Sequence, residues 1–523
     1  MKAYLMHPDR DFDAQRPAPS HEALLRQDLG LDVLLHAMAG GDDFLLDIAR
    51  KALLQGLHGD VPTILHRQAA LRDALRQPEV VRQLYALAVE AIENRKKNYW
   101  SFLGDHPTSI LHGAISMLRM FMDVLEKLRG LAEAHAGGFA SRGFGALFAM
   151  LREEFDDAYL GNVRAHLAEL RFKDGVLMSA MLGPENQGTG YVLRRPHPPA
   201  AGWLRRAFGK RPPAYTFRIA ERDLAGARTL AGMRDRAIND VANALAQSMD
   251  HILAFFEMLR AELAFYVGCL NLHARLEALG VPTAFPAAAA AGSGTLGFEG
   301  LCDAALALAQ ERPPVGNTLA ADGKRLLLVT GANQGGKSTF MRSLGLAQLM
   351  MQAGMFVTAR AFAAELCGGL FTHYKREEDA AMASGKFDEE LARLSDLAGQ
   401  VGPGALVLFN ESFASTNERE GSEVARQVVE ALLARNVKVV FVTHLYTFAR
   451  GLYERRMPDA LFLRAQRLAD GTRTFRLAEG EPLETSHGAD LYRQVFGEGQ
   501  ATSGDGGAGR PDDRTAHAGA GRA

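Results

Sequence analysis

The chain has few of the features that mark disulfide-rich, membrane-spanning or secreted proteins. Cysteine occurs 3 times, at Cys269, Cys302 and Cys367, and these unrelated spacings argue against a disulfide framework and against a zinc cluster. No uncharged apolar run reaches the roughly 18 residues that a membrane-spanning helix needs. Residues 1–10 lack the apolar core of a signal peptide. We therefore expect a cytoplasmic protein that does not bind a membrane.

An excess of charge of either sign is also absent. Lysine and arginine together number 59, aspartate and glutamate together number 61, and the formal net charge is -2. This balance excludes a uniformly basic nucleic-acid-binding protein, although it is compatible with a local basic surface. Apolar residues make up 47% and charged residues 23% of the 523 residues, which is typical of a folded protein with two or three domains.

The first part of the chain, residues 1–285, is predicted to be mainly helical. Apolar residues recur with helical spacing at Leu45, Ile48, Ala49, Ala52 and Leu53, and again at Ile115, Leu118, Met122, Leu125 and Leu128. A helical pattern without proline also runs through residues 229–279. One helix of that length would span roughly 75 Å. It either breaks near Gly268 or forms an arm that connects distant parts of the molecule.

A basic insert interrupts the helical part at about residues 184–220. Within it, residues 191–218 contain no acidic side chain, and aromatic residues and prolines are interspersed among the basic ones. One interpretation is a solvated loop. The other is a contact with the DNA backbone, in which cationic side chains displace counterions and aromatic side chains stack. The candidate DNA-binding residues are Arg194, Arg195, Arg205, Arg206, Lys210 and Arg211.

The composition changes after the helical part. Residues 286–296 are rich in alanine, glycine and serine and are predicted to be a linker. Residues 297–495 then alternate between predicted strands, loops and helices. Residues 496–523 contain almost nothing apolar, so we expect a disordered tail.

The α/β part contains a complete phosphate-binding motif. Residues 331–338 match the pattern G-x-x-x-x-G-K-[ST], follow the apolar run 325–330, and precede a predicted helix at 339–351. In such a loop the backbone N–H groups and the positive end of the helix face the phosphates. We expect Lys337 to reach the β- and γ-phosphates and Ser338 to ligate Mg²⁺. The residues predicted to bind ATP are Gly331, Ala332, Asn333, Gln334, Gly335, Gly336, Lys337, Ser338 and Thr339.

Three further candidates follow predicted buried strands. Asn410 and Glu411 end the apolar run 404–409, where such folds place a metal partner and the group that orients the attacking water. We expect Glu411 to polarise that water. Asn410 stands where an aspartate is usual, so it offers an amide oxygen without negative charge. His444 ends a third strand, where it either has a structural role or contacts the γ-phosphate; its position favours the contact.

These segments resemble the MutS family of DNA mismatch repair ATPases. The resemblance is carried by residues 330–342, 408–421 and 442–444. It implies a mainly α N-terminal helical core and lever region, followed by an α/β ABC-type P-loop ATPase domain that dimerises and holds ATP and Mg²⁺ between two subunits. It also implies that Asn317 lies near the adenine and that Ser384 contacts the partner subunit's γ-phosphate. Residues 415–417 would lie at the subunit boundary.

The chain also departs from that family. It leaves no room for N-terminal mismatch-reading and connector domains, and no nuclease domain is recognisable. The family's mismatch-reading Phe-x-Glu triplet occurs only out of context, at residues 255–257, 387–389 and 496–498. Mismatch recognition by the usual wedge is therefore not expected.

The leading interpretation is a dimeric MutS-like ATPase that couples ATP binding and hydrolysis to the clamping of mismatched or structured DNA, in mismatch repair or related DNA maintenance. The alternative is a nucleotide-gated scaffold or regulator with little hydrolysis, which Asn410 favours. A chromosome-maintenance ABC ATPase would need a coiled-coil insertion and an LSGG-like signature, and neither occurs between Lys337 and Glu411.

Overall fold

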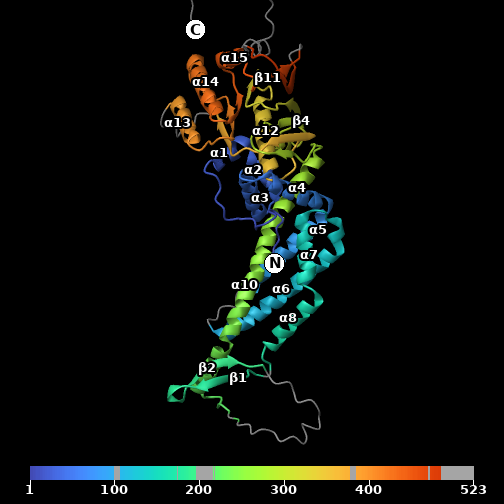
Figure 1. The fold of residues 1–523 in the computed structure, drawn as a ribbon, viewed down its shortest axis with the longest axis vertical. Coiled ribbons are helices and arrows are strands. Elements are labelled where there is room, and N and C mark those ends of the chain that lie inside the picture. Colours follow the sequence, from blue (N-terminus) through green and yellow to red (C-terminus); the bar gives the residue numbers. More distant parts are fainter. Residues whose placement is uncertain are drawn as a thin grey trace, which may run out of the picture.

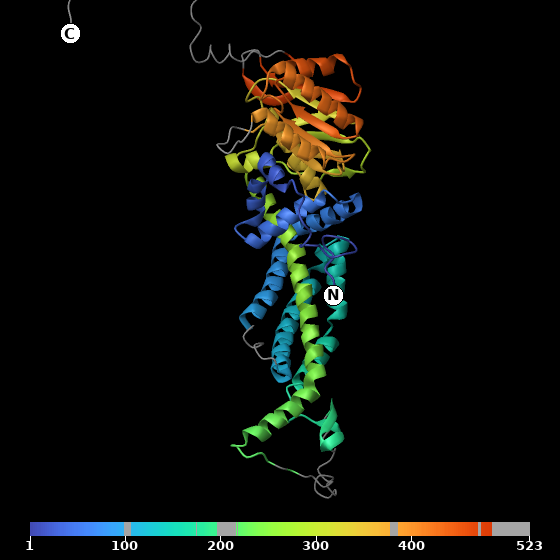
Figure 2. The same cartoon turned by 90° about the vertical axis from the view of Figure 1, so that its left-hand side faces the viewer.

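The structure is a computed structural model that describes residues 1–98, 106–173, 175–195, 216, 218–376, 385–468 and 472–483. The molecule is elongated (Figure 1), with the α/β part at one end, a helical arm extending from it, and a small β-hairpin at the other end. Figure 2, turned by a quarter, shows the same long and narrow arrangement. Within the described ranges, no helix is long and apolar enough to cross a membrane.

The first part is helical, as the sequence predicts. Its helices before the hairpin are α1 (Glu22–Leu29), α2 (Leu31–Ala39), α3 (Asp43–Gly56), α4 (Val61–Arg76), α5 (Pro78–Asn98), α6 (Pro107–His135), α7 (Arg142–Glu154) and α8 (Asp157–Glu169). The Asp42 side chain caps α3 by accepting hydrogen bonds from Phe44 N and Leu45 N. The apolar positions predicted in α3 and α6 are buried, so hydrophobic periodicity located both helices correctly.

Helix α10 (Leu224–Ala278) is one helix of 55 residues that runs along the arm. At 1.5 Å per residue it is roughly 80 Å long. It does not break at Gly268, where a Cβ would lie 3.4 Å from a Met38 side-chain atom, so the glycine lets α2 pack closely against an unbroken helix. At its far end lies the antiparallel hairpin of β1 (Met178–Leu182) and β2 (Gly188–Leu193).

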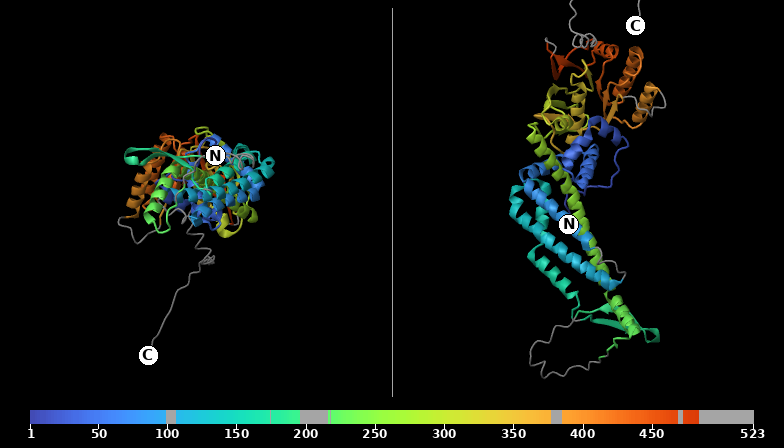
Figure 3. Two further views of the ribbon diagram at one scale, coloured as in Figure 1. Left: turned by 90° about the horizontal axis from the view of Figure 1, so that it is seen from below. Right: turned by 180° about the vertical axis from the view of Figure 1, so that it is seen from behind.

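Buried polar contacts join the N-terminal segment to the arm. The N-terminus lies beside α10 part-way along the molecule (Figure 3). Glu262 of α10 accepts hydrogen bonds from Leu5 N at 2.6 Å and from Phe12 N at 3.0 Å, and burial raises its pKa to about 7. Arg67 of α4 donates to Met6 O at 2.7 Å and to Ala353 O at 3.3 Å. This arginine therefore joins the N-terminal segment to Ala353, the residue that follows helix α12 (Lys337–Gln352).

The α/β part is built on a six-stranded sheet in the order β12-β11-β6-β10-β9-β8. Its strands are β6 (Leu326–Thr330), β8 (Leu370–Tyr374), β9 (Leu406–Asn410), β10 (Lys438–Val442), β11 (Ala460–Arg467) and β12 (Arg473–Glu479). All neighbours are parallel except β11 and β12. The central strands β6, β9 and β10 are buried on both faces, which explains their continuous apolar sequences.

Helices cover both faces of this sheet. Helix α12 (Lys337–Gln352) packs on one face, in a core shared with the first part of the chain. Helices α13 (Lys386–Ala398), α14 (Glu418–Ala434) and α15 (Tyr446–Glu454) pack on the other face around a separate core. Helices α1 and α3 also contact α12. The hydrophobic core is therefore continuous across residue 285, where the sequence predicts the end of the helical domain.

A second sheet of four strands contains part of the segment that was predicted to be a linker. Its order is β3 (Ala287–Ala289), β7 (Ala361–Glu365), β4 (Leu296–Leu301) and β5 (Asn317–Ala320), and α11 (Ala304–Gln310) follows β4. Residues 287–289, expected to form a linker, are a strand that pairs in parallel with β7. An alanine run has little intrinsic strand preference, so pairing with β7 decides its conformation.

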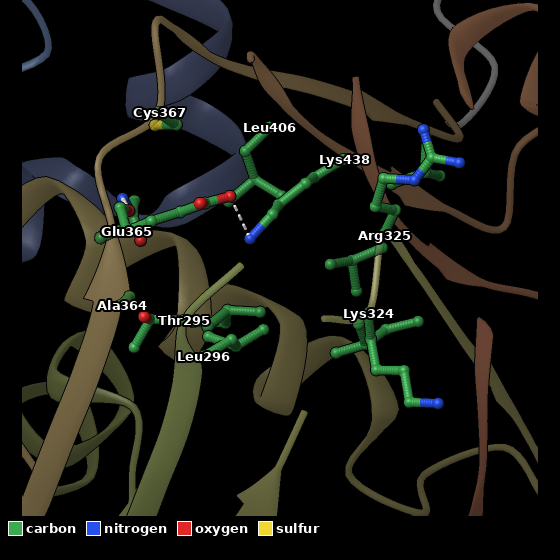
Figure 4. Close-up of a pocket in the computed structure, with 14 residues that line it drawn as sticks. Thr295, Leu296, Lys324, Arg325, Ala364, Glu365, Cys367, Leu406 and Lys438 are labelled. Carbon is green, nitrogen blue, oxygen red and sulfur yellow. Dashed lines mark hydrogen bonds and ion pairs between the residues drawn. The ribbon is translucent and has the colours of Figure 1, made fainter. Parts of the chain in front are cut away.

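A small cavity lies between the two sheets (Figure 4). Its volume is about 20 Å³, which suits a single water molecule but no nucleotide. Figure 4 shows Glu365 of β7 and Lys438 of β10 pointing toward each other across it, and they form an ion pair. Glu365 also accepts a 2.6 Å hydrogen bond from Gly294 N. None of the residues 331–338 lines this cavity.

Candidate nucleotide site

The predicted phosphate loop connects β6 to α12. Strands β6, β10 and β9 are parallel neighbours, so their carboxyl ends meet at one edge of the sheet. Asn410 ends β9, Glu411 follows it, and His444 follows β10. The fold thus brings Lys337, Asn410, Glu411 and His444 together, although they are far apart in sequence.

Lys337 is held inside the loop. Its Nζ donates hydrogen bonds of 2.9 Å to Gly331 O and Ala332 O, and it lies 3.2 Å from His444 Nε2. The residue is 4% exposed, and burial lowers the pKa of its ammonium group to about 8. The loop needs glycine at Gly336, where φ is 91° and a Cβ would lie 3.0 Å from Phe475 O.

The side chains of Ser338 and Asn410 place two oxygen atoms next to each other. Ser338 Oγ donates a hydrogen bond of 2.9 Å to Asn410 Oδ1. Hydroxyl, amide and carboxylate oxygens are hard ligands that suit Mg²⁺, which usually keeps several waters. In the described ranges there is no group of three or more histidine, cysteine or acidic residues that could hold a metal alone. The donor set fits a magnesium ion that arrives with a polyphosphate, with Glu411 as the nearby acidic group.

Glu411 and His444 form a hydrogen-bonded pair. His444 Nε2 lies 3.0 Å from Glu411 Oε1, and this bond is the main reason why the Glu411 pKa is lowered. A hydrogen on His444 Nε2 can be donated to the Glu411 carboxylate. Lys337 does not compete for it, because Lys337 donates to two backbone carbonyls. The carboxylate is therefore ionised at neutral pH and can accept a proton or a hydrogen bond from water.

A larger cavity opens beside the phosphate loop. Its volume is about 510 Å³, and it is lined by residues that include Asn317, Val315, Gln334, Thr339 and Phe475. The lining is more apolar than polar, which suits the face of a base. Asn317, predicted to lie near the adenine, is one of these lining residues, and its Oδ1 accepts a 2.8 Å hydrogen bond from Leu477 N. It therefore anchors β12 to the wall of the cavity.

Phe475 was not found by sequence reasoning. It lies in β12, is 47% exposed, and has a φ of 57°. A single phenylalanine in a strand carries no motif. Strand β11 is the neighbour of β6, and β12 is the edge strand beyond it. The pairing of β12 with β11 is what places this ring beside the loop. Arg473 of the same strand donates a 2.6 Å hydrogen bond to Gln334 Oε1 and fixes the tip of the loop.

Arg194 and Arg195, two of the remaining candidates, do not join this cluster. Arg194 and Arg195 follow β2 at the far end of the arm, where Arg194 Nε donates to Ser179 Oγ and Arg195 pairs with Glu169, both at 2.9 Å. Arg205, Arg206, Lys210, Arg211, Ser384 and the predicted tail lie outside the described residues. Gly385 is the N-cap of α13.

Comparisons with known proteins agree with this architecture. The MutS2 N-terminal domain model matches residues 59–279, and the MutS domain V model matches residues 327–489. "MutS protein homolog 4" of Mus musculus is 27% identical over 161 residues, which cover 31% of this chain and 16% of the relative. "Endonuclease MutS2" of Thermus thermophilus is 35% identical over 141 residues, 26% of this chain and 19% of the relative.

A third relative, "DNA mismatch repair protein MutS" of Granulibacter bethesdensis, is 34% identical over 128 residues, 24% of this chain and 14% of the relative. The chain thus spans less than a fifth of the length of these relatives. Both family models and all three relatives carry the MutS name in their descriptions. One match covers the helical arm and the other covers the nucleotide site, and on both grounds the chain belongs to the MutS family.

Proposed function

We propose that this chain is a DNA-clamping ATPase that works as a homodimer. The observation that carries the proposal is the convergence of Lys337, the Ser338–Asn410 pair and the Glu411–His444 pair at one edge of the parallel sheet. Two nucleotide sites, each shared between subunits, open and close the helical arms. The α/β part acts as an ABC-type P-loop ATPase domain.

ATP binds along the phosphate loop with its base in the neighbouring cavity. Lys337 exchanges its two carbonyl contacts for phosphate oxygens, whose negative charge offsets the cost of its burial. Ser338 and Asn410 hold the magnesium ion, which neutralises phosphate charge when bound. Positioning and electrostatics supply most of the catalysis in this kind of phosphoryl transfer.

Hydrolysis depends on the Glu411–His444 pair. The Glu411 carboxylate, ionised because His444 stabilises it, accepts a hydrogen bond from the attacking water and orients it toward the γ-phosphate. His444 Nε2, within 3.2 Å of Lys337 Nζ, is close to where that phosphate would lie. The imidazole is thus able to contact both the water-orienting group and the phosphate.

Dimerisation completes each site. The N-terminus of α13 at Gly385 is a favourable anion-binding end, and we assign it to the partner subunit's γ-phosphate. ATP favours the closed dimer only to the extent that it binds that state more tightly than the open one. The continuous helix α10 and the Arg67 contacts would carry this closure from the α/β part to the far end of the arm.

The ligand of the arms is DNA. Residues 184–195 of the basic insert include strand β2 of the hairpin at the far end of the arm, and Arg194 and Arg195 follow that strand. Substitution of Arg194, Arg195, Arg205, Arg206, Lys210 and Arg211 by glutamine should weaken DNA binding and flatten its salt dependence. Arg152 and Arg164, on α7 and α8, provide a control for lost positive charge elsewhere on the arm. Unchanged affinity in the first variant would identify the insert as a solvated loop.

The test of the enzymatic function is steady-state ATP hydrolysis with and without homoduplex, mismatched and branched DNA. Glu411→Gln should abolish turnover and retain ATP binding, and DNA should raise the rate of the wild type. The Glu418→Gln variant is the control, because Glu418 lies on α14 and bonds to Thr447 instead of His444. Wild-type turnover that survives Glu411→Gln refutes the assigned role.

A second candidate function is a nucleotide-gated scaffold or regulator with little hydrolysis. Asn410 favours it, because the amide brings no negative charge to the metal ligands. For this candidate, ATP should drive dimerisation of the wild type without measurable turnover under any DNA condition. Analytical ultracentrifugation with ATP and Mg²⁺, alongside the hydrolysis assay, separates the two functions.

A further inference from the structure

The backbone around Glu411 has an unusual conformation for its residues. φ is 55° at Glu411 and 65° at Phe413, in the left-handed region that residues other than glycine rarely adopt. The Phe413 side chain is fully buried, with its ring 6.2 Å from Phe409 and 6.4 Å from Phe441. Such a conformation persists only where surrounding contacts hold it in place. Some of these contacts come from outside the segment, from β8 and α13.

Glu390 of α13 provides the first contact. The residue is 2% exposed, and its Oε1 accepts a 2.7 Å hydrogen bond from Phe413 N. Its Oε2 is buried and has no hydrogen-bond partner among the atoms that the structure describes. Burial of a carboxylate with one unsatisfied oxygen is costly, which argues against a purely space-filling role.

His373 of β8 provides the second contact. Its Nε2 lies 3.2 Å from Glu390 O, and its Nδ1 lies 2.8 Å from Ser412 Oγ. Burial lowers the His373 pKa to about 4, so the ring is neutral at pH 7. The Ser412 hydroxyl donates a 2.7 Å hydrogen bond to His373 O, so Ser412 contacts both the ring and the backbone of His373.

These bonds form a path between helix α13 and the catalytic segment. Glu390 contributes its side chain to Phe413 N and its backbone carbonyl to His373, and His373 in turn holds Ser412. Ser412 directly follows Glu411, so both ends of the path meet the residues after the catalytic carboxylate. A shift of α13 along its axis would change the Glu390 contacts and, through them, the direction of Glu411.

We propose that Glu390, His373 and Ser412 are positioning residues that make the orientation of Glu411 depend on helix α13 of the same subunit. This inference rests on the proposed function, in which the N-terminus of α13 meets the partner subunit's nucleotide. Each subunit then hydrolyses its own ATP efficiently only when its own α13 is engaged across the interface. The two sites of a dimer are thereby coupled through a buried, local path.

The first experiment separates positioning from binding. Glu390→Ala should lower kcat for ATP by about tenfold or more while KM stays within about threefold, because the lost contact acts on the catalytic group and not on bound ATP. Glu390→Gln should restore most of the rate, since its amide oxygen can still accept from Phe413 N. Asp396→Ala, an exposed acid on the same helix, is the control. Unchanged kcat in Glu390→Ala overturns the inference.

A second variant covers the case in which Glu390→Ala fails to fold. Ser412→Ala removes one hydroxyl, and it should lower kcat by about threefold or more with the affinity for a non-hydrolysable ATP analogue unchanged. The midpoint of thermal unfolding, measured in parallel, shows whether the fold is intact. A folded Ser412→Ala protein with wild-type kcat contradicts the inference.

Mixed dimers test whether the effect stays within one subunit. Subunits with Glu390→Ala and with Glu411→Gln carry different affinity tags, and the mixed dimer is isolated by sequential purification. Only the Glu390→Ala subunit can hydrolyse ATP, so turnover should be about a tenth or less of that of a wild-type and Glu411→Gln dimer. Equal turnover in the two mixed dimers overturns the inference. Failure of the proposed function looks different, because the wild type itself would then lack turnover or ATP-driven dimerisation.

Discussion

Ser338 Oγ donates a 2.9 Å hydrogen bond to Asn410 Oδ1, which joins the first turn of α12 to the end of β9. The two side chains that we assign to the metal are thus in contact. Because one of them is an amide, the contact carries no net charge. The charge that these two side chains bring to the metal therefore depends on whether residue 410 is an amide or a carboxylate.

Asn410→Asp should strengthen the metal site. A carboxylate at this position forms charge-assisted contacts, so half-maximal ATP hydrolysis should need roughly tenfold less Mg²⁺, and the maximal rate should rise. The measurement is a magnesium titration of steady-state turnover. Asn417→Asp is the control, because Asn417 caps α14 away from Ser338. An unchanged magnesium requirement would show that the missing charge does not limit the reaction.

Lys337 should bind a proton when ATP binds near pH 8. Burial lowers its pKa to about 8, and contacts with phosphate would favour the charged ammonium group and raise the pKa again. ATP affinity should therefore be constant well below pH 8 and fall as the pH rises through 8. Titration calorimetry in buffers of different ionisation enthalpy should show proton uptake at pH 8.5 and little at pH 6.5.

The matching variant is Lys337→Ala. It should lose ATP binding and keep its fold, because in the described ranges the lysine side chain bonds to its own loop and to His444 and to no other segment. Lys127→Ala, on α6 in the arm, is the control for removing a lysine elsewhere. ATP affinity that persists in Lys337→Ala is incompatible with the assigned phosphate loop.

Phe475→Ala should weaken ATP binding. The ring lines the cavity beside the phosphate loop, and stacking of a base on an aromatic side chain contributes about 1–3 kcal/mol, so KM for ATP should rise at least about fivefold. The change should be small for inorganic triphosphate, which has no base, in a competition assay. Phe475→Tyr keeps the ring and serves as the control. Equal losses for ATP and triphosphate would place the base elsewhere.

Gly421→Ala should destabilise the segment behind Glu411. A Cβ at Gly421 of α14 would lie 2.2 Å from Phe413 O, so the helix must move away, at a cost of about 1–3 kcal/mol or more in unfolding free energy. Gly451→Ala is the matched control, because that glycine lies in helix α15 with open space around it. It should stabilise the protein by about 0.5–1 kcal/mol. Chemical denaturation of both variants measures the difference.

Glu262 should make stability fall as the pH rises toward neutrality. Its pKa is raised from 4.5 to about 7 by burial, so its contribution is fully present below pH 4.5 and is lost as the pH rises through 7. The loss is on the order of 3 kcal/mol. In Glu262→Gln this part of the pH dependence should disappear, whereas Glu257→Gln, exposed on the same helix, should keep it. Unfolding free energies at pH 5 and pH 8 provide the comparison.

Local sequence patterns determined much of the fold and of the site. The phosphate loop is recognisable because a continuous stretch of backbone and a single lysine form it. The residue types that it requires therefore stand next to one another in the sequence. Helices α3 and α6 are recognisable for the same reason, since a buried face imposes a repeat on neighbouring positions. Glu411 and His444 could be identified because each follows a buried strand.

Tertiary structure decided what depends on residues far apart in the chain. The strand at Ala287–Ala289 exists because β7 offers a partner, and α10 stays unbroken at Gly268 because α2 packs against it. The pairing of β12 with β11 places Phe475 in the wall of the larger cavity. The packing of α13 brings Glu390 into contact with Phe413 N. No spacing or composition encodes these contacts, because their energy comes from surfaces that meet only after the chain has folded.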